Sequence, residues 1–408
     1  MRILHLSDFY TPTIGGLERH VETLSREFVA LGHEVDVVTL RVGDRPAHEV
    51  RDGVRVHRVR GWSTALAPFY ENPERPFHPT VPDPGLVATL RRAVAILRPD
   101  VVHSQSWLQY SYSPLYRRGS GPAHVATLHD YGLACAKKTY QFNGGQWCDG
   151  PRLAKCVRCA TGQYGPAKAA ALVTGLRASR PLLHNADAYI AVSSAVARAA
   201  GAALPPGMPV SVIPSMVPDG IAEGDTPRPD FLPPGDYLLY VGALGRHKGV
   251  DVLLAAHERM RHRRPLVLVG TRHDDDLGLD RPGVTVVHDQ PHASVMAAWR
   301  SALLGVVPSV WHEPMGQVAV EAMLTGRAVV ASDVGGLRDI VDHGVTGLRV
   351  PPSDPIALAA ALDELVADPT RAATMGAAGR DMAARYQASV VAPRVIDVFE
   401  QVIAARRA

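Results

Sequence analysis

The sequence predicts an α/β protein with two domains, each built on a parallel β-sheet that helices cover on both faces. Short apolar strands alternate with segments of helical spacing, and the alternation restarts after a segment rich in Pro, Gly and Asp at 219–237. Such alternation indicates parallel strands, because a parallel pair needs a crossover connection that is usually a helix. The length of 408 residues allows two or three domains of roughly 150 residues each.

The first domain is expected to span residues 1–215. Apolar residues recur three or four positions apart at 18–31, which predicts a helix that ends at Gly32. Two segments interrupt the alternation, a proline-rich stretch at 62–85 and a stretch at 131–165 that holds all four cysteines. We expect a second helix at 86–97 and strands at 2–6, 34–40, 101–103, 123–128, 188–192 and 210–213.

The second domain is expected to span residues 216–386, with the linker near Asp219. Its predicted strands lie at 237–241, 266–269, 284–287, 304–307, 328–331 and 347–350. Its predicted helices lie at 250–260, 295–301, 317–324, 337–341 and 355–367. The remaining residues, 387–408, are expected to form an amphipathic helix that crosses back to the first domain.

Composition excludes several classes of protein. Lys and Arg number 43 against 40 Asp and Glu, a net charge of +3, which is too small for a nucleic-acid binder. The 46% hydrophobic content is too high for a disordered chain. No apolar run approaches the roughly 18 residues of a membrane span. The first residues are expected to form a strand rather than a signal peptide, so we expect a cytoplasmic protein with at most peripheral membrane contact.

The segment around Glu313 and Glu321 carries the most chemical information. Pro314 suits the first turn of a helix, and Gly316 lets a ligand approach a helix end that favours anions. Glu321 would lie about 7 Å along the axis of that helix. A nucleoside diphosphate sugar fits this spacing, with phosphates at the helix end, ribose hydroxyls at Glu321 and sugar hydroxyls at Glu313. The alternative is a helix start with two ordinary glutamates.

The cysteines leave three interpretations open. They are Cys135, Cys148, Cys156 and Cys159, and the last two form a Cys-x-x-Cys pair. Four cysteines in one segment suit a structural zinc ion in a reducing compartment, although the outer spacing is irregular. Disulfides and free thiols are the alternatives. A redox-catalytic role is not expected, because no thioredoxin-like pattern surrounds the pair.

The chain resembles the retaining family 4 glycosyltransferases. The Glu-x7-Glu signature from Glu313 to Glu321 is similar to theirs, and other segments resemble family motifs in the same order. These segments are 10–18, 127–130, 240–250, 333–336 and 344–348. The resemblance covers essentially the whole chain. It implies the GT-B fold, in which two Rossmann-like domains face a central cleft and the C-terminal domain binds the nucleotide.

The resemblance also implies roles for residues of the first domain. Gly15 and Gly16 would let the first helix approach the donor phosphates or the reacting sugar, although the pair alone also suits a tight turn. His129 would contact the donor sugar near the reaction centre, or else be a core histidine. The acceptor would bind between 62–85, 104–107 and the cysteine segment. Trp107 and Tyr131 would stack on it or serve only in packing.

In the second domain, Arg246 and Lys248 would neutralise the leaving diphosphate, unless they belong to a solvated loop. The donor would also contact the helix start, at Met315, Gly316, Gln317 and Val318. The chain departs from the family at Ala243, where Arg is usual, and Arg246 is a candidate to compensate. The acidic run at 273–276 is expected to be solvated surface.

The implied reaction is transfer of a sugar from a UDP- or GDP-sugar with retention of configuration. In front-face attack the diphosphate oxygen takes the proton, so the reaction needs no protein base. The positive charge of Lys248, Arg246 and the helix start stabilises the leaving group, so it needs no catalytic metal. The acceptor is expected to be a soluble sugar, natural product or glycan. The alternatives are a sugar-nucleotide epimerase of the same architecture and a weakly active donor-binding partner subunit, the latter suggested by Ala243.

Overall fold

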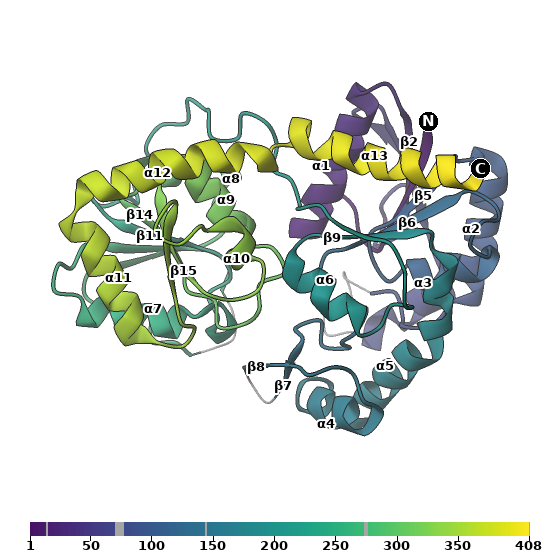
Figure 1. Cartoon of the computed structure of the whole chain (residues 1–408), viewed down its shortest axis with the longest axis horizontal. Coiled ribbons are helices and arrows are strands. Elements are labelled where there is room, and N and C mark those ends of the chain that lie inside the picture. Colours follow the sequence, from purple (N-terminus) through teal and green to yellow (C-terminus); the bar gives the residue numbers. More distant parts are fainter. Residues whose placement is uncertain (14, 70–76, 143–144, 273–275, 408) are drawn as a thin grey trace. The chain divides into compact units, whose positions relative to one another are not determined.

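The computed structural model describes residues 1–13, 15–69, 77–142, 145–272 and 276–407. The chain divides into two compact units (Figure 1). Unit 1 comprises Met1–Met216 and Ala388–Ala408, and unit 2 comprises Val217–Gln387. Each unit contains a parallel sheet with helices packed on it, which confirms the predicted α/β class.

The sheet of unit 1 has the strand order β10-β9-β6-β5-β1-β2-β4-β3. Its described strands pair in parallel except β3 with β4. Chain order reverses between β1 and β5, and the crevice at the carboxyl ends of such strands is the usual ligand site of an open α/β sheet. The strands are β1 Arg2–Ser7, β2 Glu34–Leu40, β3 His48–Arg51, β4 Val54–Val59, β5 Val101–Ser104, β6 Ala123–Leu128, β9 Ala188–Ala191 and β10 Val210–Val212.

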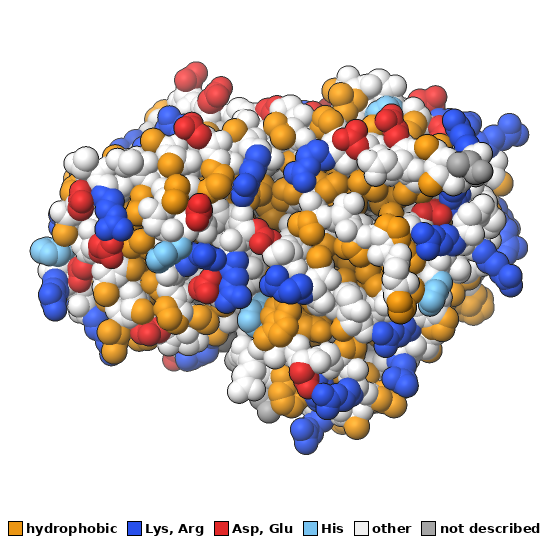
Figure 2. All heavy atoms as spheres, viewed as in Figure 1, with side chains coloured by type: hydrophobic (Ala, Val, Ile, Leu, Met, Phe, Trp, Pro, Cys, Tyr) orange, Lys and Arg blue, Asp and Glu red, His pale blue; other side chains and the backbone are white. Residues whose placement is uncertain are grey.

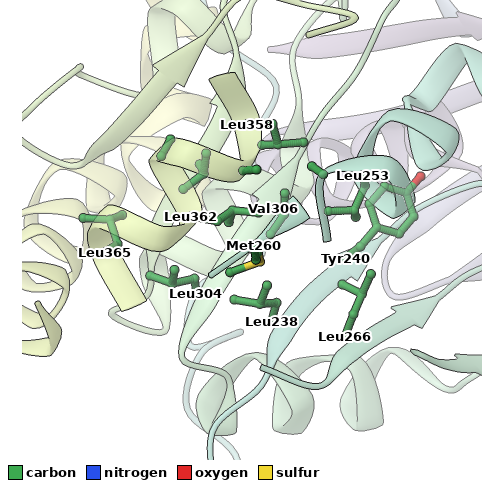
Figure 3. Packing of buried hydrophobic residues seen from close by; sticks show 14 of the residues in the cluster. Leu238, Tyr240, Leu253, Met260, Leu266, Leu304, Val306, Leu358, Leu362 and Leu365 are labelled. Atoms are coloured by element: carbon green, nitrogen blue, oxygen red, sulfur yellow. The ribbon is translucent and has the colours of Figure 1, made fainter. Parts of the chain in front are cut away.

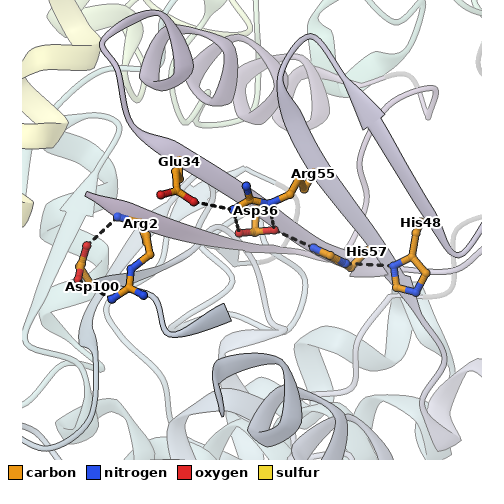
Figure 4. Close-up of polar contacts among 7 residues, drawn as sticks. All are labelled: Arg2, Glu34, Asp36, His48, Arg55, His57 and Asp100. Atoms are coloured by element: carbon orange, nitrogen blue, oxygen red, sulfur yellow. Dashed lines mark hydrogen bonds and ion pairs between the residues drawn. The ribbon is translucent and has the colours of Figure 1, made fainter. Parts of the chain in front are cut away.

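Sequence patterns missed β3 and β4, because their alternation of polar and apolar residues is short and rich in charge. Polar contacts along this edge of the sheet are shown in Figure 4. Asp36 is buried on β2 and accepts hydrogen bonds from Arg55 and His57 on β4 at 2.7–2.9 Å. Burial alone would raise the pKa of Asp36, and these hydrogen bonds more than offset that effect, so the pKa lies below its ordinary value.

The helices of unit 1 include several that the sequence patterns did not predict, notably those within and after the cysteine segment. They are α1 Gly16–Ala30, α2 Pro84–Leu97, α3 Gln109–Tyr112, α4 Leu153–Tyr164, α5 Pro166–Ser179, α6 Ser194–Gly201 and α13 Ala388–Arg407. A short hairpin of β7 Gln141–Phe142 and β8 Gln146–Trp147 precedes α4. We expected the cysteine segment, 131–165, to form a loop, but its described residues include this hairpin and helix α4.

The proline-rich segment begins with a 3-10 helix at Trp62–Phe69. Asp83 fixes it, because its carboxylate accepts hydrogen bonds from the Ser63 hydroxyl and the Trp62 backbone N–H while also capping α2. Residues 70–76 of this segment lie outside the described residues.

Helix α13 is last in the sequence and packs within the core of unit 1. Val391, Val395 and Phe399 are buried in the same cluster as Phe28 of α1. The rings of Phe28 and Phe399 meet edge to face with centroids 5.8 Å apart. Figure 1 shows α13 crossing α1, and the two helices are in contact.

The sheet of unit 2 has the order β13-β12-β11-β14-β15-β16, and its described strands are all parallel. The strands are β11 Leu238–Val241, β12 Leu266–Val269, β13 Val284–Val287, β14 Leu304–Val307, β15 Ala328–Ser332 and β16 Gly347–Val350. The helices are α7 Val250–Arg259, α8 His292–Ser301, α9 Gln317–Leu324, α10 Leu337–Ile340, α11 Pro355–Ala367 and α12 Pro369–Ala383. Helix α12 was not predicted.

Figure 3 shows the core of unit 2, where apolar residues of α7 and α11 pack on those of β11 and β14. Helix α11 presents Leu358, Leu362 and Leu365 to this core at helical spacing. Its start is fixed by Asp354, whose carboxylate accepts from two backbone N–H groups, and by Pro355 in the first turn.

Charge on the outside of the protein is mixed. On the face in Figure 2, Lys and Arg side chains are interspersed with Asp and Glu and with apolar side chains. Among the described residues, no helix has both the length and the apolar character that crossing a membrane requires.

We predict that Leu362→Ala lowers the free energy of unfolding by about 2–5 kcal/mol, because it leaves a cavity in this core. Chemical denaturation measures the change. Ile356→Ala on the same helix is the matched control, since Ile356 is 72% exposed. The control should shift stability by less than about 0.5 kcal/mol, and similar losses for both variants would contradict the assigned packing.

Candidate active site

A cavity of about 400 Å³ opens in unit 1 at the carboxyl ends of β1, β5 and β6. This position is the switch point of the strand order, where the sheet offers a crevice. The residues that line it are Asp8, Phe9, Gly15, Gly16, Leu17, Glu18, Phe77, Gln105, Ser106, Trp107, Gln109, Thr127, Leu128, His129, Asp130, Leu133 and Lys138.

The start of α1 lies at this cavity, as Gly15 and Gly16 predict. The helix begins at Gly16, and Gly15 before it has no side chain that could cap the first turn. The backbone N–H groups of an uncapped helix start favour a negatively charged group. Glu18 in the same turn supplies some of that negative charge from the protein itself.

His129 follows β6 and donates from Nε2 to the side-chain oxygen of Gln105 at 2.7 Å. The amide nitrogen of Gln105 lies 3.0 Å from Nδ1 of His103, and Nε2 of His103 lies 2.7 Å from the Thr127 hydroxyl. The carbonyl oxygen of Gln105 only accepts, so a neutral His129 carries its proton on Nε2 and keeps a lone pair on Nδ1. Gln105 was not singled out from the sequence, because its role depends on the neighbouring strand.

His129 is held neutral. Burial lowers its pKa to about 3. Its ring packs edge-on against His20, with centroids 4.8 Å apart, and burial also lowers the pKa of His20. A neutral imidazole can accept a hydrogen bond from a sugar hydroxyl.

The two aromatic residues expected at the acceptor site differ in position. Trp107 lines the cavity and donates from its indole N–H to the Gly132 carbonyl at 3.1 Å. Tyr131 is buried and packs on Tyr140 and Trp147, with centroids 5.8 Å away in each case, and it is absent from the residues that line the cavity. Trp107 is therefore placed to meet a ligand, whereas Tyr131 is a packing residue.

In unit 2, Lys248 and Glu313 form an ion pair, with 2.5 Å between Nζ and Oε1. Glu313 is buried and also accepts from the Ser309 hydroxyl at 2.7 Å. Burial alone would raise its pKa, but the charge of Lys248 and the hydrogen bonds lower it below the ordinary value, so Glu313 is ionised. The ammonium group also lies 5.0 Å from the centre of the Trp311 ring.

Three glycines permit this arrangement. Gly249 has a φ of +72°, and a Cβ there would lie 1.9 Å from the Pro308 carbonyl oxygen. A Cβ on Gly335 would lie 2.1 Å from the Glu313 carbonyl oxygen, and the N–H of Gly336 donates to that oxygen at 2.7 Å. The glycines of the 333–336 motif thus serve close backbone approach to Glu313.

Helix α9 begins at Gln317, and Gly316 precedes it with a φ of +97°. Pro314 therefore lies before the helix, and our placement of it in the first turn was wrong. The left-handed conformation of Gly316 separates the bend at Met315 from the helix, which ends as predicted at Leu324. Gly316, the residue before the helix, supplies no side-chain cap to the first turn, which includes Gln317 and Val318.

Glu321 lies inside α9, and its carboxylate is 2.9 Å from Nε2 of His292. It is 8% exposed, so its second oxygen has limited solvent access. His292 begins α8 and was not predicted to be part of the site, because no sequence motif links it to α9. The pair places a hydrogen-bonding imidazole on the carboxylate assigned to the ribose.

The structure does not bring Arg246 to the Lys248–Glu313 pair. Its guanidinium lies 3.5 Å from Asp251 and donates to the Asp276 carbonyl at 3.0 Å. Ala243, where the family usually has Arg, accepts a hydrogen bond at its carbonyl from Tyr240. Residues 273–275 of the acidic run lie outside the described residues.

The four cysteines surround one small pocket in unit 1. No disulfide links them, and within the described ranges no group of three or more His, Cys, Asp or Glu is arranged to hold a metal ion. Lysines contact two of the sulfurs, with Lys155 Nζ at 3.2 Å from Cys148 and Lys137 Nζ at 3.7 Å from Cys159. Burial raises the pKa of Cys135 and of Cys156, which favours their thiol forms.

Comparison with known proteins identifies the class. Residues 14–219 match the family model Glycosyltransferase Family 4, and residues 235–368 match Glycosyl transferases group 1. The D-inositol 3-phosphate glycosyltransferase of Thermobispora bispora is 30% identical over 96% of this chain and 91% of that protein. The glycogen synthase of Mycobacterium tuberculosis is 29% identical over 93% of this chain and 89% of that protein.

Among solved structures, the sucrose-phosphate synthase of Thermosynechococcus elongatus has a TM-score of 0.74 and 25% identity, covering 99% of both chains. The fold is GT-B, and the protein is a glycosyltransferase. The chain belongs to glycosyltransferase family 4. This confirms the family suggested by the Glu-x7-Glu signature and does not favour the epimerase alternative.

We predict that the His129 ring is a neutral Nε2–H tautomer between about pH 5 and 8. Because its pKa is lowered to about 3, protonation should occur only as the pH falls toward that value. Gln105→Leu should increase the Nδ1–H form, because Nε2–H loses its acceptor. Nitrogen-15 NMR of the histidine rings measures both. A His129 ring that titrates near its ordinary value would contradict the network.

We also predict that Lys248→Met lowers the free energy of unfolding by about 2–4 kcal/mol, because it leaves the buried Glu313 carboxylate without its cation. The pKa of Glu313 should then rise. Adding Glu313→Gln in the same chain should recover most of the stability, since no buried charge remains. A double variant as unstable as Lys248→Met would show that the pair does not account for the loss.

Proposed function

We propose that the protein transfers a sugar from a nucleoside diphosphate sugar to an acceptor hydroxyl, with retention of configuration and without a catalytic metal. The observation that carries the proposal is the Lys248–Glu313 pair just before the start of α9, with Glu321 inside the same helix. This arrangement offers a cation and backbone N–H groups to a diphosphate and carboxylates to hydroxyl groups.

The donor would bind on unit 2. Lys248 and the N–H groups of Gln317 and Val318 would face the diphosphate, Glu321 would accept from the ribose hydroxyls, and Glu313 would accept from the sugar hydroxyls. Met315 and Gly316 would contact the diphosphate through the backbone. The base of the donor, uracil or guanine, would be recognised outside this set.

The transfer step would follow front-face attack. The acceptor oxygen bonds to the anomeric carbon on the side from which the diphosphate leaves, and its proton passes to the departing phosphate oxygen. The positive charge of Lys248 and the α9 start stabilise the negative charge that develops on that oxygen. Neutral His129 would accept a hydrogen bond at Nδ1 from a hydroxyl of the reacting sugar. It would not serve as a general base, because its lowered pKa makes the ring a poor proton acceptor. Arg246 would assist only by changing its contacts with Asp251 and Asp276.

The acceptor would bind in the cavity of unit 1. The cavity lies at the switch point of the sheet and carries His129 and Trp107 on its wall. Gly15 and Gly16 would bring the start of α1 to the reacting sugar or the donor phosphates. The reaction would therefore require both units.

The test is a thermal-shift screen of UDP- and GDP-sugars with the full chain, followed by NMR of the product to read its anomeric configuration. A donor that binds should raise the melting temperature by mass action. Retained configuration and undiminished transfer in a metal chelator would support the proposal. Absence of donor binding, an inverted product or loss of activity in the chelator would contradict it.

We predict that Glu321→Gln weakens binding of the stabilising donor about tenfold or more, because it removes charge-assisted hydrogen bonds to the ribose. Calorimetric titration measures the dissociation constant. Glu223→Gln, an exposed change in the same unit, is the matched control. Equal affinities of Glu321→Gln and the control would argue against the ribose role.

A further inference from the structure

Asp8 follows β1 and is a buried carboxylate on the wall of the unit 1 cavity, only 1% exposed. Its Oδ1 accepts from the Ser106 hydroxyl at 2.7 Å and from the Leu108 backbone N–H at 3.0 Å. Its Oδ2 is buried and has no hydrogen-bond partner among the described residues. One oxygen therefore fixes the carboxylate, and the other is left without a donor.

Gln109 on the same wall presents a second buried acceptor. It begins α3 and is 4% exposed, and its side-chain oxygen also lacks a hydrogen-bond partner in the described part of the chain. A buried acceptor without a donor costs about 1–3 kcal/mol. Two such oxygens on one cavity indicate that a ligand supplies the donors.

The charges on the cavity wall point to the same kind of ligand. Among the described residues that line it, Asp8, Glu18 and Asp130 carry carboxylates, and Lys138 is the one Lys or Arg. His129 adds no charge, because its pKa is lowered to about 3.

Lys138 already has partners. Its ammonium lies 3.6 Å from Asp130 and over the rings of Phe77 and Trp107, at 4.8 and 4.2 Å from their centres. The start of α1 on the same wall favours an anion, but Glu18 in its first turn already places a carboxylate there. A phosphate group in the cavity would meet the excess of carboxylates and compete with the contacts of Lys138. Hydroxyl or ammonium groups would meet acceptors.

We propose that this cavity binds the acceptor substrate, whose hydroxyl or amine groups donate hydrogen bonds to the side-chain oxygens of Asp8 and Gln109. The acceptor substrate is then a neutral or amine-bearing sugar or cyclitol rather than a sugar phosphate. The inference rests on the proposed function, in which this cavity holds the acceptor. Under this proposal, the acceptor of this chain differs from that of any relative whose acceptor carries a phosphate.

Asp8→Asn is the informative variant. The Asn side-chain oxygen can still accept from Ser106 and Leu108, while an NH₂ group replaces the unpartnered oxygen and the negative charge is lost. We expect it to weaken binding of donor-rich sugars about tenfold and to leave a sugar phosphate unaffected or better bound. Gln109→Leu removes the second acceptor without changing charge, and it should weaken the neutral and aminated sugars several-fold. It serves as the second test if Asp8→Asn does not fold.

The experiment is saturation-transfer NMR of the full chain with glucose, glucosamine and glucose 6-phosphate, each titrated separately. Melting temperatures establish that the variants are folded, and Asp44→Asn, an exposed change in unit 1, is the control. Tighter binding of glucose or glucosamine than of glucose 6-phosphate, with the difference reduced about tenfold by Asp8→Asn, would support the inference. The relative affinities of glucose and glucosamine separate the hydroxyl from the amine source.

The inference would be overturned if glucose 6-phosphate bound more tightly than glucose and glucosamine. It would also be overturned if Asp8→Asn and Gln109→Leu both left the relative affinities of the three sugars unchanged, or if none of the three sugars bound. Lys138→Met gives an independent reading, because it would abolish binding of an acceptor held by its phosphate. Donor binding is measured separately in the thermal-shift screen. Donor binding with a preference for glucose 6-phosphate refutes only this inference, whereas absence of donor binding refutes the proposed function.

Discussion

The chemistry of unit 2 depends on one constraint, namely that the buried carboxylate of Glu313 needs a cation. Lys248 supplies it, and the ion pair in turn fixes the backbone on both sides. Lys248 reaches Glu313 because Gly249 turns the chain in a left-handed conformation against Pro308. Gly335 and Gly336 close the other side by packing on the backbone of Glu313 itself. Segments that are far apart in sequence are thus held in one arrangement by a charge that water cannot solvate.

The buried histidines of unit 1 differ from this ion pair because they are uncharged. The central strands of unit 1 place His5 and His103 side by side in register, and Gln105 links His103 to His129. The Thr127 hydroxyl contacts the other nitrogen of His103. Burial lowers the pKa of each of these rings, so the network is polar without being charged. Such a network orders its hydrogen bonds in one direction and fixes the tautomer of His129. Unit 2 therefore contributes a buried ion pair, whereas the histidine network of unit 1 contributes oriented neutral hydrogen bonds.

Much of this could be predicted from the sequence, because the evidence was local. The strands of both sheets other than β3 and β4, and the helices at 317–324 and 355–367, follow from apolar periodicity. Glu313 and Glu321 were singled out by their spacing together with the helix start around them and the family resemblance. The contacts that complete the site could not be predicted in this way. Gln105, His292 and Asp8 act through residues on other strands or helices, and only the strand order brings them together. The contacts of Arg246 with Asp251 and Asp276 likewise depend on tertiary structure. The positive charge of Arg246 alone had suggested a position beside the leaving diphosphate.

The place of α13 in unit 1 also has a consequence for biosynthesis. Val391, Val395 and Phe399 complete a core whose other members, such as Phe28, are synthesised at the opposite end of the chain. During translation, unit 2 has all of its residues available before unit 1 does. Unit 1 therefore cannot complete its core until α13 has been synthesised, and part of its apolar surface stays uncovered until then. This is the reverse of the usual order, in which N-terminal domains fold first.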